Sequence, residues 1–336
     1  MTETAKTYEL GDFQLDSGEI LKDAKLVYQT YGTLAADGKN VVVMPTFYTG
    51  SHDRNEGFFG SGRALDPARH FIISVNLFGG GKSSSPSNAV QSGASFPAIS
   101  FQDNIRAQHQ LLTAELGVLE IALVLGWSMA GCQAYNWAVQ YPDMVKAILP
   151  FCASAKTSPH NFVFLEGVKA ALCADPIWNN GNYDTQPAEG LKAFGRVYAG
   201  WAFSQTFYRK GLYRELGYES VAALLDDWAE DHAENWDAND LLCKLATWQA
   251  GDVSAGTEFG GDLAKALGSI KARTILMPCT QDLYFPPEDN ELEASLIPGA
   301  KFCPVNSDFG HCAANPGNDA EFAQVLDSNI AELLNG

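Results

Sequence analysis

The sequence contains few basic residues, with 22 lysines and arginines against 40 aspartates and glutamates, and a formal net charge of −18 at pH 7. A protein that binds a phosphate backbone needs a basic surface. No apolar run approaches the roughly 20 residues of a membrane span. The opening stretch MTETAKTYEL lacks the basic-then-apolar pattern of a signal peptide. We therefore expect a cytoplasmic protein with no nucleic-acid partner and no membrane partner.

The cysteines and histidines form no metal-binding pattern. The seven cysteines are odd in number and include no Cys-x-x-Cys pair, so neither a zinc site nor a disulfide framework is indicated. The neighbours His52–Asp53 and Asp231–His232 are isolated pairs, which are usually surface residues. We expect no metal and no cofactor, and most cysteines to be buried free thiols.

The remaining composition suits a large globular core, because 46% of the 336 residues are hydrophobic. The first forty residues alternate apolar and polar side chains, which predicts antiparallel strands with turns at Gly11 and at 16–18. A capping pair, Ser100 and Asp103, indicates a helix start. Short apolar runs predict buried strands at 40–46, 70–79, 119–126, 145–153, 272–280 and 300–306, and amphipathic spacing predicts helices at 100–118, 129–143 and 319–334. This alternation predicts an α/β fold with a mostly parallel, doubly wound sheet.

Residues 156–268 have a different pattern of apolar residues. Their spacing is helical, and no run of residues predicts a parallel strand convincingly. We interpret this stretch as a helical lid inserted into a core formed by residues 1–155 and 269–336. A separate second domain is the alternative interpretation.

The stretch LGWSMAGCQ (125–133) resembles the Gly-x-Ser-x-Gly elbow that carries a catalytic serine. Gly126 and Ser128 fit the pattern, but Ala130 occupies the closing position and Gly131 follows one residue late. The stretch lies where a predicted strand meets a predicted helix, which is the context that an elbow requires. We predict that Ser128 is a nucleophile; a structural serine in an ordinary turn is the alternative.

A serine nucleophile needs a histidine base held by a carboxylate, in the chain order serine, acid, histidine on this fold. His311 follows the last predicted strand, and Asp282 follows the strand before it. Glu288 and Asp289 are alternatives for the acid that lie further into the loop. An oxyanion hole needs two backbone N–H groups, of which Met129 supplies one and the loop at 45–52 supplies the other.

The chain resembles the homoserine O-acetyltransferase family of α/β-hydrolases from about residue 20 onward. The resemblance is carried by ALDPARHFIISVNLFGG, FPAISFQDNIRAQHQLLTAELGV, GWSMAGCQAYNWAVQYPDMV, DANDLL, QDLYFPPED and GH. It implies an α/β-hydrolase fold with a helical lid that also forms a homodimer contact. It also implies that Ser128, Asp282 and His311 form a triad, and that Tyr48 supplies the second oxyanion N–H.

Several family residues for homoserine are replaced here. The arginine and tyrosine of its Arg-Phe-Asp-x-Asn-Ser-Tyr stretch correspond to Asn235 and Leu241, and the aspartate after the histidine is Cys312. With Phe47 and Trp127, we expect Leu241 and Cys312 to line a pocket with few charges.

With these replacements, the chain resembles an atypical branch of the family. That branch resembles carboxylesterases, for which ethyl acetate is an example substrate. We therefore predict a serine carboxylesterase that hydrolyses short-chain, acetate-type esters through an acyl-enzyme. The alternatives are an O-acyltransferase that uses acetyl-CoA with an acceptor other than homoserine, and a non-catalytic binding module.

Overall fold

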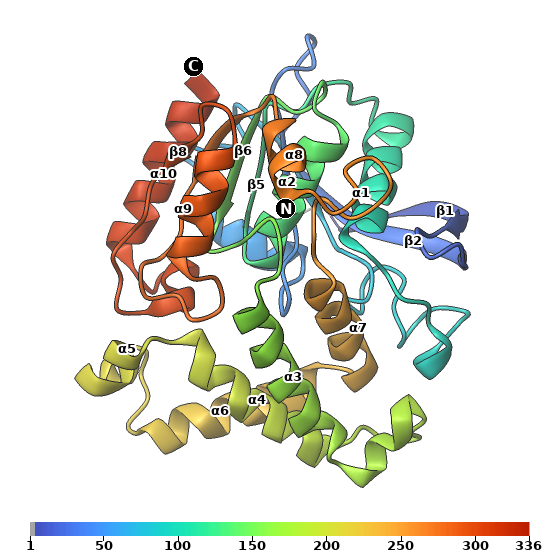
Figure 1. Cartoon of the computed structure of the whole chain (residues 1–336), viewed down its shortest axis with the longest axis vertical. Coiled ribbons are helices and arrows are strands. Elements are labelled where there is room, and N and C mark those ends of the chain that lie inside the picture. Colours follow the sequence, from blue (N-terminus) through green and yellow to red (C-terminus); the bar gives the residue numbers. More distant parts are fainter. Residues whose placement is uncertain (1–3, 336) are drawn as a thin grey trace.

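The structure is a computed structural model that describes residues 4–335. An eight-stranded sheet runs through the middle of the molecule in the order β1-β2-β4-β3-β5-β6-β7-β8 (Figure 1). The strands are β1 (Lys6–Gln14), β2 (Ile20–Tyr31), β3 (Val41–Pro45), β4 (Phe71–Val75), β5 (Leu123–Trp127), β6 (Ala147–Phe151), β7 (Arg273–Leu276) and β8 (Lys301–Phe302).

The first two strands are antiparallel to their neighbours, and every pairing from β4 onward to β8 is parallel. Parallel strands need crossover connections, which are usually helices that cover both faces of the sheet. The chain follows this rule, and the predicted α/β fold with a mostly parallel sheet is confirmed.

Alternate residues of each central strand enter two separate hydrophobic cores. The helices of this part are α1 (Phe101–Gln110), α2 (Met129–Gln140), α8 (Leu263–Gly268), α9 (Pro287–Leu296) and α10 (Ala320–Asn335). In β3, Val42 and Met44 pack on the side of α10, whereas Val41 and Val43 pack on the side of α1 and α2. Both sides of the strand are buried, which explains its continuous apolar run.

Helices alone form the regular structure between β6 and β7 within the described residues. They include α3 (Pro159–Cys173), α4 (Ala188–Ala202), α5 (Gln205–Lys210), α6 (Val221–Asn235) and α7 (Ala238–Gln249). These five lie together at one end of the sheet, below it in Figure 1, whereas α8 packs beside α9. We call α3–α7 the lid helices.

Three local predictions differ from the structure. Gly11 lies inside β1 at an irregularity in the pairing with β2, so it forms a bulge and not a turn. The helix predicted to reach residue 118 ends at Gln110 and continues as a short π-helical segment, Leu111–Glu115. The strand predicted at 300–306 is regular only over Lys301–Phe302, because its later residues pair in an isolated bridge.

The start of α1 agrees with its sequence signal. The Ser100 side chain accepts a hydrogen bond from Asp103 N–H, and the Asp103 carboxylate accepts one from Ser100 N–H.

No helix among residues 4–335 is both long enough and apolar enough to cross a bilayer.

Candidate active site

Ser128 occupies the junction between β5 and α2 with φ of 59° and ψ of −130°. A non-glycine residue with positive φ is uncommon and marks a strained position. Its backbone N–H donates to Phe151 O at 3.1 Å, which ties the junction to the neighbouring strand β6. The sharp turn is therefore the strand-turn-helix geometry that a nucleophile elbow requires.

Small residues around the serine are required by close packing. A Cβ added to Gly126 would lie 2.3 Å from Ala130 Cβ, and one added to Gly131 would lie 2.4 Å from Ala153 Cβ. Both distances are too short for real atoms, so each position needs glycine. The extra methyl group of Ala130 fits because it occupies the space that Gly126 leaves open.

His311 and Asp282 form a buried pair at the carboxyl ends of β8 and β7. His311 Nδ1 lies 2.7 Å from Asp282 Oδ2. An ionised carboxylate only accepts hydrogen bonds, so Nδ1–H donates and leaves Nε2 unprotonated in the neutral ring. The histidine is thereby held in the tautomer that a general base needs.

The Asp282 carboxylate is fixed by its own neighbours. Its Oδ1 accepts hydrogen bonds from the backbone N–H groups of Tyr284 at 2.7 Å and Phe285 at 3.1 Å. Cys152 Sγ also lies close to this pair. Burial raises the pKa of the Cys152 thiol well above its ordinary value, which keeps that thiol neutral beside the carboxylate.

Two buried residues after parallel strands, Met129 and Tyr48, have backbone N–H groups without an acceptor in the described part of the chain. Met129 begins α2 directly after the serine, and Tyr48 lies in the loop after β3. Within residues 4–335, neither N–H has a hydrogen-bond acceptor. Free N–H groups at a helix start and an adjacent loop are the donors from which oxyanion holes are built.

The lid helix α7 holds the Tyr48 loop at two points. The Tyr48 hydroxyl donates to Leu241 O at 2.8 Å, and the amine of Lys244 donates to Tyr48 O. Lys244 is fully buried, and burial lowers its pKa to about 8. Lys244 Nζ lies 5.3 Å from the centroid of the Tyr48 ring and 4.6 Å from that of the Trp236 ring. Both distances are those of cation–π contacts.

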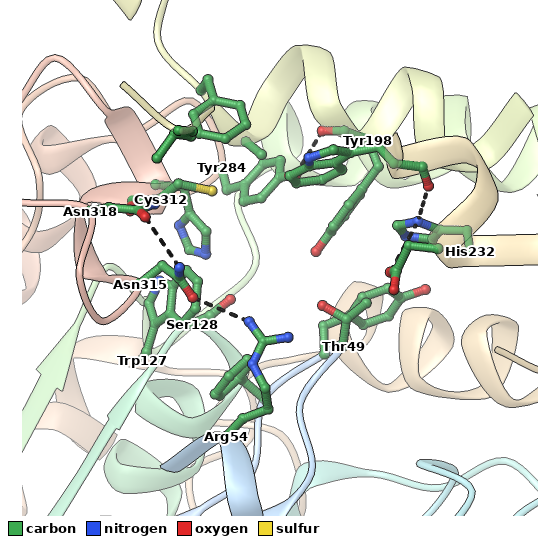
Figure 2. A pocket seen from close by; sticks show the side chains of 18 of the residues that line it. Thr49, Arg54, Trp127, Ser128, Tyr198, His232, Tyr284, Cys312, Asn315 and Asn318 are labelled. Carbon is green, nitrogen blue, oxygen red and sulfur yellow. Dashed lines mark hydrogen bonds and ion pairs between the residues drawn. The ribbon is translucent and has the colours of Figure 1, made fainter. Parts of the chain in front are cut away.

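A cavity of 410 Å³ opens beside Ser128 and His311. Of the predicted pocket residues, Phe47, Trp127 and Cys312 line this cavity, together with Tyr48. Leu241 does not line it: the side chain is fully buried, and this residue reaches the site through the carbonyl that accepts from Tyr48. Figure 2 shows Trp127 and Ser128 on one wall and Tyr198 and His232 across the space.

Three charged side chains, which the sequence did not single out as pocket residues, also line this cavity. The lining includes Arg54 from the short 3-10 helix His52–Phe58 after β3, and Asp227 and Asp231 from α6. The Arg54 guanidinium donates to Asn315 Oδ1 at 3.2 Å and is drawn toward the space in Figure 2. Helical periodicity in the sequence could not show which lid residues meet the core, so Asp227 and Asp231 carried no sequence signal.

His232 is another correction, because it was expected at the surface and is only 3% exposed. It lines the cavity from α6. The stretch that differs from the homoserine O-acetyltransferase pattern is divided by burial: Asn235 is exposed and donates to Asp231, whereas Asp240 is buried and accepts from Ser87.

Comparison with known proteins shows the family to which this chain belongs. Residues 39–314 match the family described as alpha/beta hydrolase fold. A probable esterase of Corynebacterium glutamicum is 37% identical over 335 residues, covering 98% of this chain and 95% of that protein. The ethyl acetate hydrolase of Pseudomonas veronii is 39% identical over 330 residues, covering 97% of this chain and 94% of that protein.

The chain is also similar to homoserine O-acetyltransferases. A homoserine O-acetyltransferase of Nostoc punctiforme is 33% identical over 320 residues, covering 90% of this chain and 89% of that protein. The solved structure of the acetyl esterase MekB superposes with a TM-score of 0.96 at 37% identity, covering 100% of this chain and 98% of that one. The chain therefore belongs to the alpha/beta hydrolase fold family and is an enzyme of its esterase branch, which is similar in sequence to the homoserine O-acetyltransferases.

Proposed function

We propose that this protein is a serine carboxylesterase that hydrolyses short-chain, acetate-type esters. Ser128 Oγ attacks the ester carbonyl while His311 Nε2 takes its proton, and Asp282 stabilises the imidazolium that forms. The N–H groups of Met129 and Tyr48 stabilise the negative charge on the carbonyl oxygen. His311 returns the proton to the leaving alcohol, and the acyl group stays on Ser128.

Water then completes the cycle. His311 removes a proton from a water molecule, which attacks the acyl-enzyme carbonyl through a second oxyanion. Collapse of that intermediate releases the carboxylic acid and returns the proton to Ser128. No metal or cofactor takes part in this sequence of steps.

One observation supports the proposal above all: the strained Ser128 lines the same cavity as His311, whose Nδ1 lies 2.7 Å from Asp282 Oδ2. A serine that served only to make a turn would not need a buried, tautomer-fixed histidine beside it. The Trp127 ring stacks on His311 at 5.1 Å and the Phe47 ring lies 4.8 Å from Trp127. These rings narrow the cavity near the serine, which supports a short acyl group.

The relatives support the same acyl group, because two of them are named as an ethyl acetate hydrolase and an acetyl esterase. The test is hydrolysis of ethyl acetate and of p-nitrophenyl esters with acyl chains of increasing length, by the wild type and by Ser128→Ala. We expect turnover that falls as the acyl chain lengthens and that depends on Ser128. Equal rates in the two proteins would refute the proposal.

Acyl transfer is the second candidate, because a homoserine O-acetyltransferase is among the relatives. The same acyl-enzyme would pass its acetyl group from acetyl-CoA to an alcohol, amine or thiol other than homoserine. Release of CoA measured with and without candidate acceptors separates the two functions. Release that depends on the acceptor and exceeds ester hydrolysis would favour transfer.

We also propose that the lid helices join two copies in a homodimer. Several large apolar side chains are exposed there, including Phe162 at 46% and Val163 at 66%. An exposed apolar face on one region is typical of a protein contact. Light scattering of the wild type and of Phe162→Ser/Val163→Ser tests this: a mass of one chain in the wild type would refute it.

A further inference from the structure

His232 lines the cavity beside Ser128 and has a buried ring nitrogen without a hydrogen-bond partner within residues 4–335. The residue comes from lid helix α6, is 3% exposed and lines the same cavity as Ser128. Figure 2 shows it on the far side of that space from Ser128 and Trp127. Its Nε2 atom is buried and has no hydrogen-bond partner among the described residues.

The second ring nitrogen defines what Nε2 can do. His232 Nδ1 lies 2.7 Å from Trp228 O. A carbonyl oxygen only accepts, so Nδ1–H is the donor and Nε2 of the neutral ring is an acceptor. Burial lowers the pKa of His232, so the ring is neutral near pH 7. Buried acceptors are nearly always paired, and the residue that carries this one lines a cavity that a ligand can enter.

The surroundings hold the ring in place without satisfying Nε2. Phe194 and Trp228 pack against it with ring centroids at 5.5 and 6.1 Å. Gly195 makes room for it, since a Cβ there would lie 3.0 Å from Nδ1. The nearby charges of Asp231 and Lys244 act on the pKa of the ring in opposite directions. An unprotonated Nε2 binds a hydrogen-bond donor.

The size of the cavity leaves room for such a donor. At roughly 30 Å³ per water-sized group, a space of 410 Å³ exceeds what a small ester such as ethyl acetate fills. If the acyl group is short and lies against Trp127, a group that reaches His232 belongs to the alcohol part of the ester.

We propose that His232 Nε2 accepts a hydrogen bond from a hydroxyl group on the alcohol part of the substrate, so that the enzyme prefers monoesters of diols or polyols. This inference rests on the proposed esterase function. His232 would then determine specificity, while Ser128 and His311 carry out the reaction.

The test compares esters that differ by one hydroxyl group. The monoacetates of ethylene glycol, 1,3-propanediol and 1,4-butanediol are measured against ethyl, propyl and butyl acetate, and the readout is the ratio of kcat/KM within each pair. We expect the wild type to prefer the hydroxyl ester by about five- to tenfold for at least one chain length. His232→Phe should abolish this preference. The control variant His160→Phe, which changes an exposed lid histidine, should keep it.

A second variant covers the case in which His232→Phe does not fold. His232→Asn offers an amide donor for Trp228 O and retains an acceptor oxygen, so it should keep part of the preference. An unchanged ratio in His232→Phe, or no preference in the wild type at any length, would overturn the inference while leaving the esterase function intact. A wild type that cleaves none of the esters would overturn the function itself and this inference with it.

Discussion

The two walls of the cavity come from two regions that are built differently. On the side of the sheet, Ser128, Asp282 and His311 follow the ends of three parallel strands, and backbone hydrogen bonds fix their positions. On the side of the lid, His232 and Tyr198 line the cavity from packed helices. Under the proposed function, the sheet edge would carry the chemistry and the lid helices would select the ester.

The largest effect outside the serine itself should come from Asp282→Asn on the sheet side. Oδ1 already accepts from two backbone N–H groups, so the amide nitrogen would have to face His311 Nδ1. Two donors would then oppose each other and the histidine would take the wrong tautomer. We expect kcat to fall about 10³- to 10⁴-fold with little change in KM, measured by ester hydrolysis.

The matched control for that change is Asp289→Asn, the alternative acid in the first turn of α9. It should retain activity within a few-fold of the wild type. A large loss in Asp289→Asn together with a small loss in Asp282→Asn would reverse the assignment of the acid.

A smaller effect is expected where the lid touches the sheet side. Lys244→Met removes the buried amine that donates to Tyr48 O and holds the loop carrying an oxyanion N–H. We expect kcat to fall about tenfold, because misplacement of an oxyanion donor weakens it without removing it. KM and Tm are measured in parallel. A loss of Tm with unchanged kcat would show that Lys244 serves only packing.

The smallest effect concerns stability and lies in the core, away from both walls. Glu293 is buried and accepts hydrogen bonds from Tyr135 at 2.6 Å and Ala155 N–H at 2.7 Å, and burial raises its pKa to about 7. Between its ordinary pKa and 7, the folded chain binds a proton that the unfolded chain has lost. The free energy of unfolding should therefore fall as pH rises from about 5 to 7.5.

Glu293→Gln should remove this contribution. The two unfolding curves should differ in slope by up to about 1.4 kcal/mol per pH unit, measured by urea unfolding at several pH values. Parallel curves for the two proteins would show that Glu293 does not titrate in this window.

The sequence predicted the sheet side much better than the lid side. Ser128, Asp282 and His311 follow strands with distinct apolar runs, so chain order and local motifs were enough to single them out. The lid contributions depend on which face of each helix meets the core, and helical spacing alone does not contain that information. His232 and Leu241 illustrate this: one was expected at the surface and lines the cavity, whereas the other was expected in the pocket and is packed behind it.

Some details of the local backbone could not be predicted from the sequence for a related reason. Gly11 is compatible with either a turn or a bulge, and pairing with β2 selects the bulge. Ala130 at the elbow looked unfavourable by pattern, but the structure places its methyl group in the space beside Gly126. Both outcomes depend on neighbours that are far away in the chain or in a different element.

Labelling with a fluorophosphonate, followed by peptide mapping, shows whether Ser128 is the nucleophile, because the probe reacts with an activated serine. We expect one label per chain on the peptide that contains Ser128, and none in Ser128→Ala. Wild-type protein that hydrolyses esters but carries its label on another residue, or carries none, would contradict it.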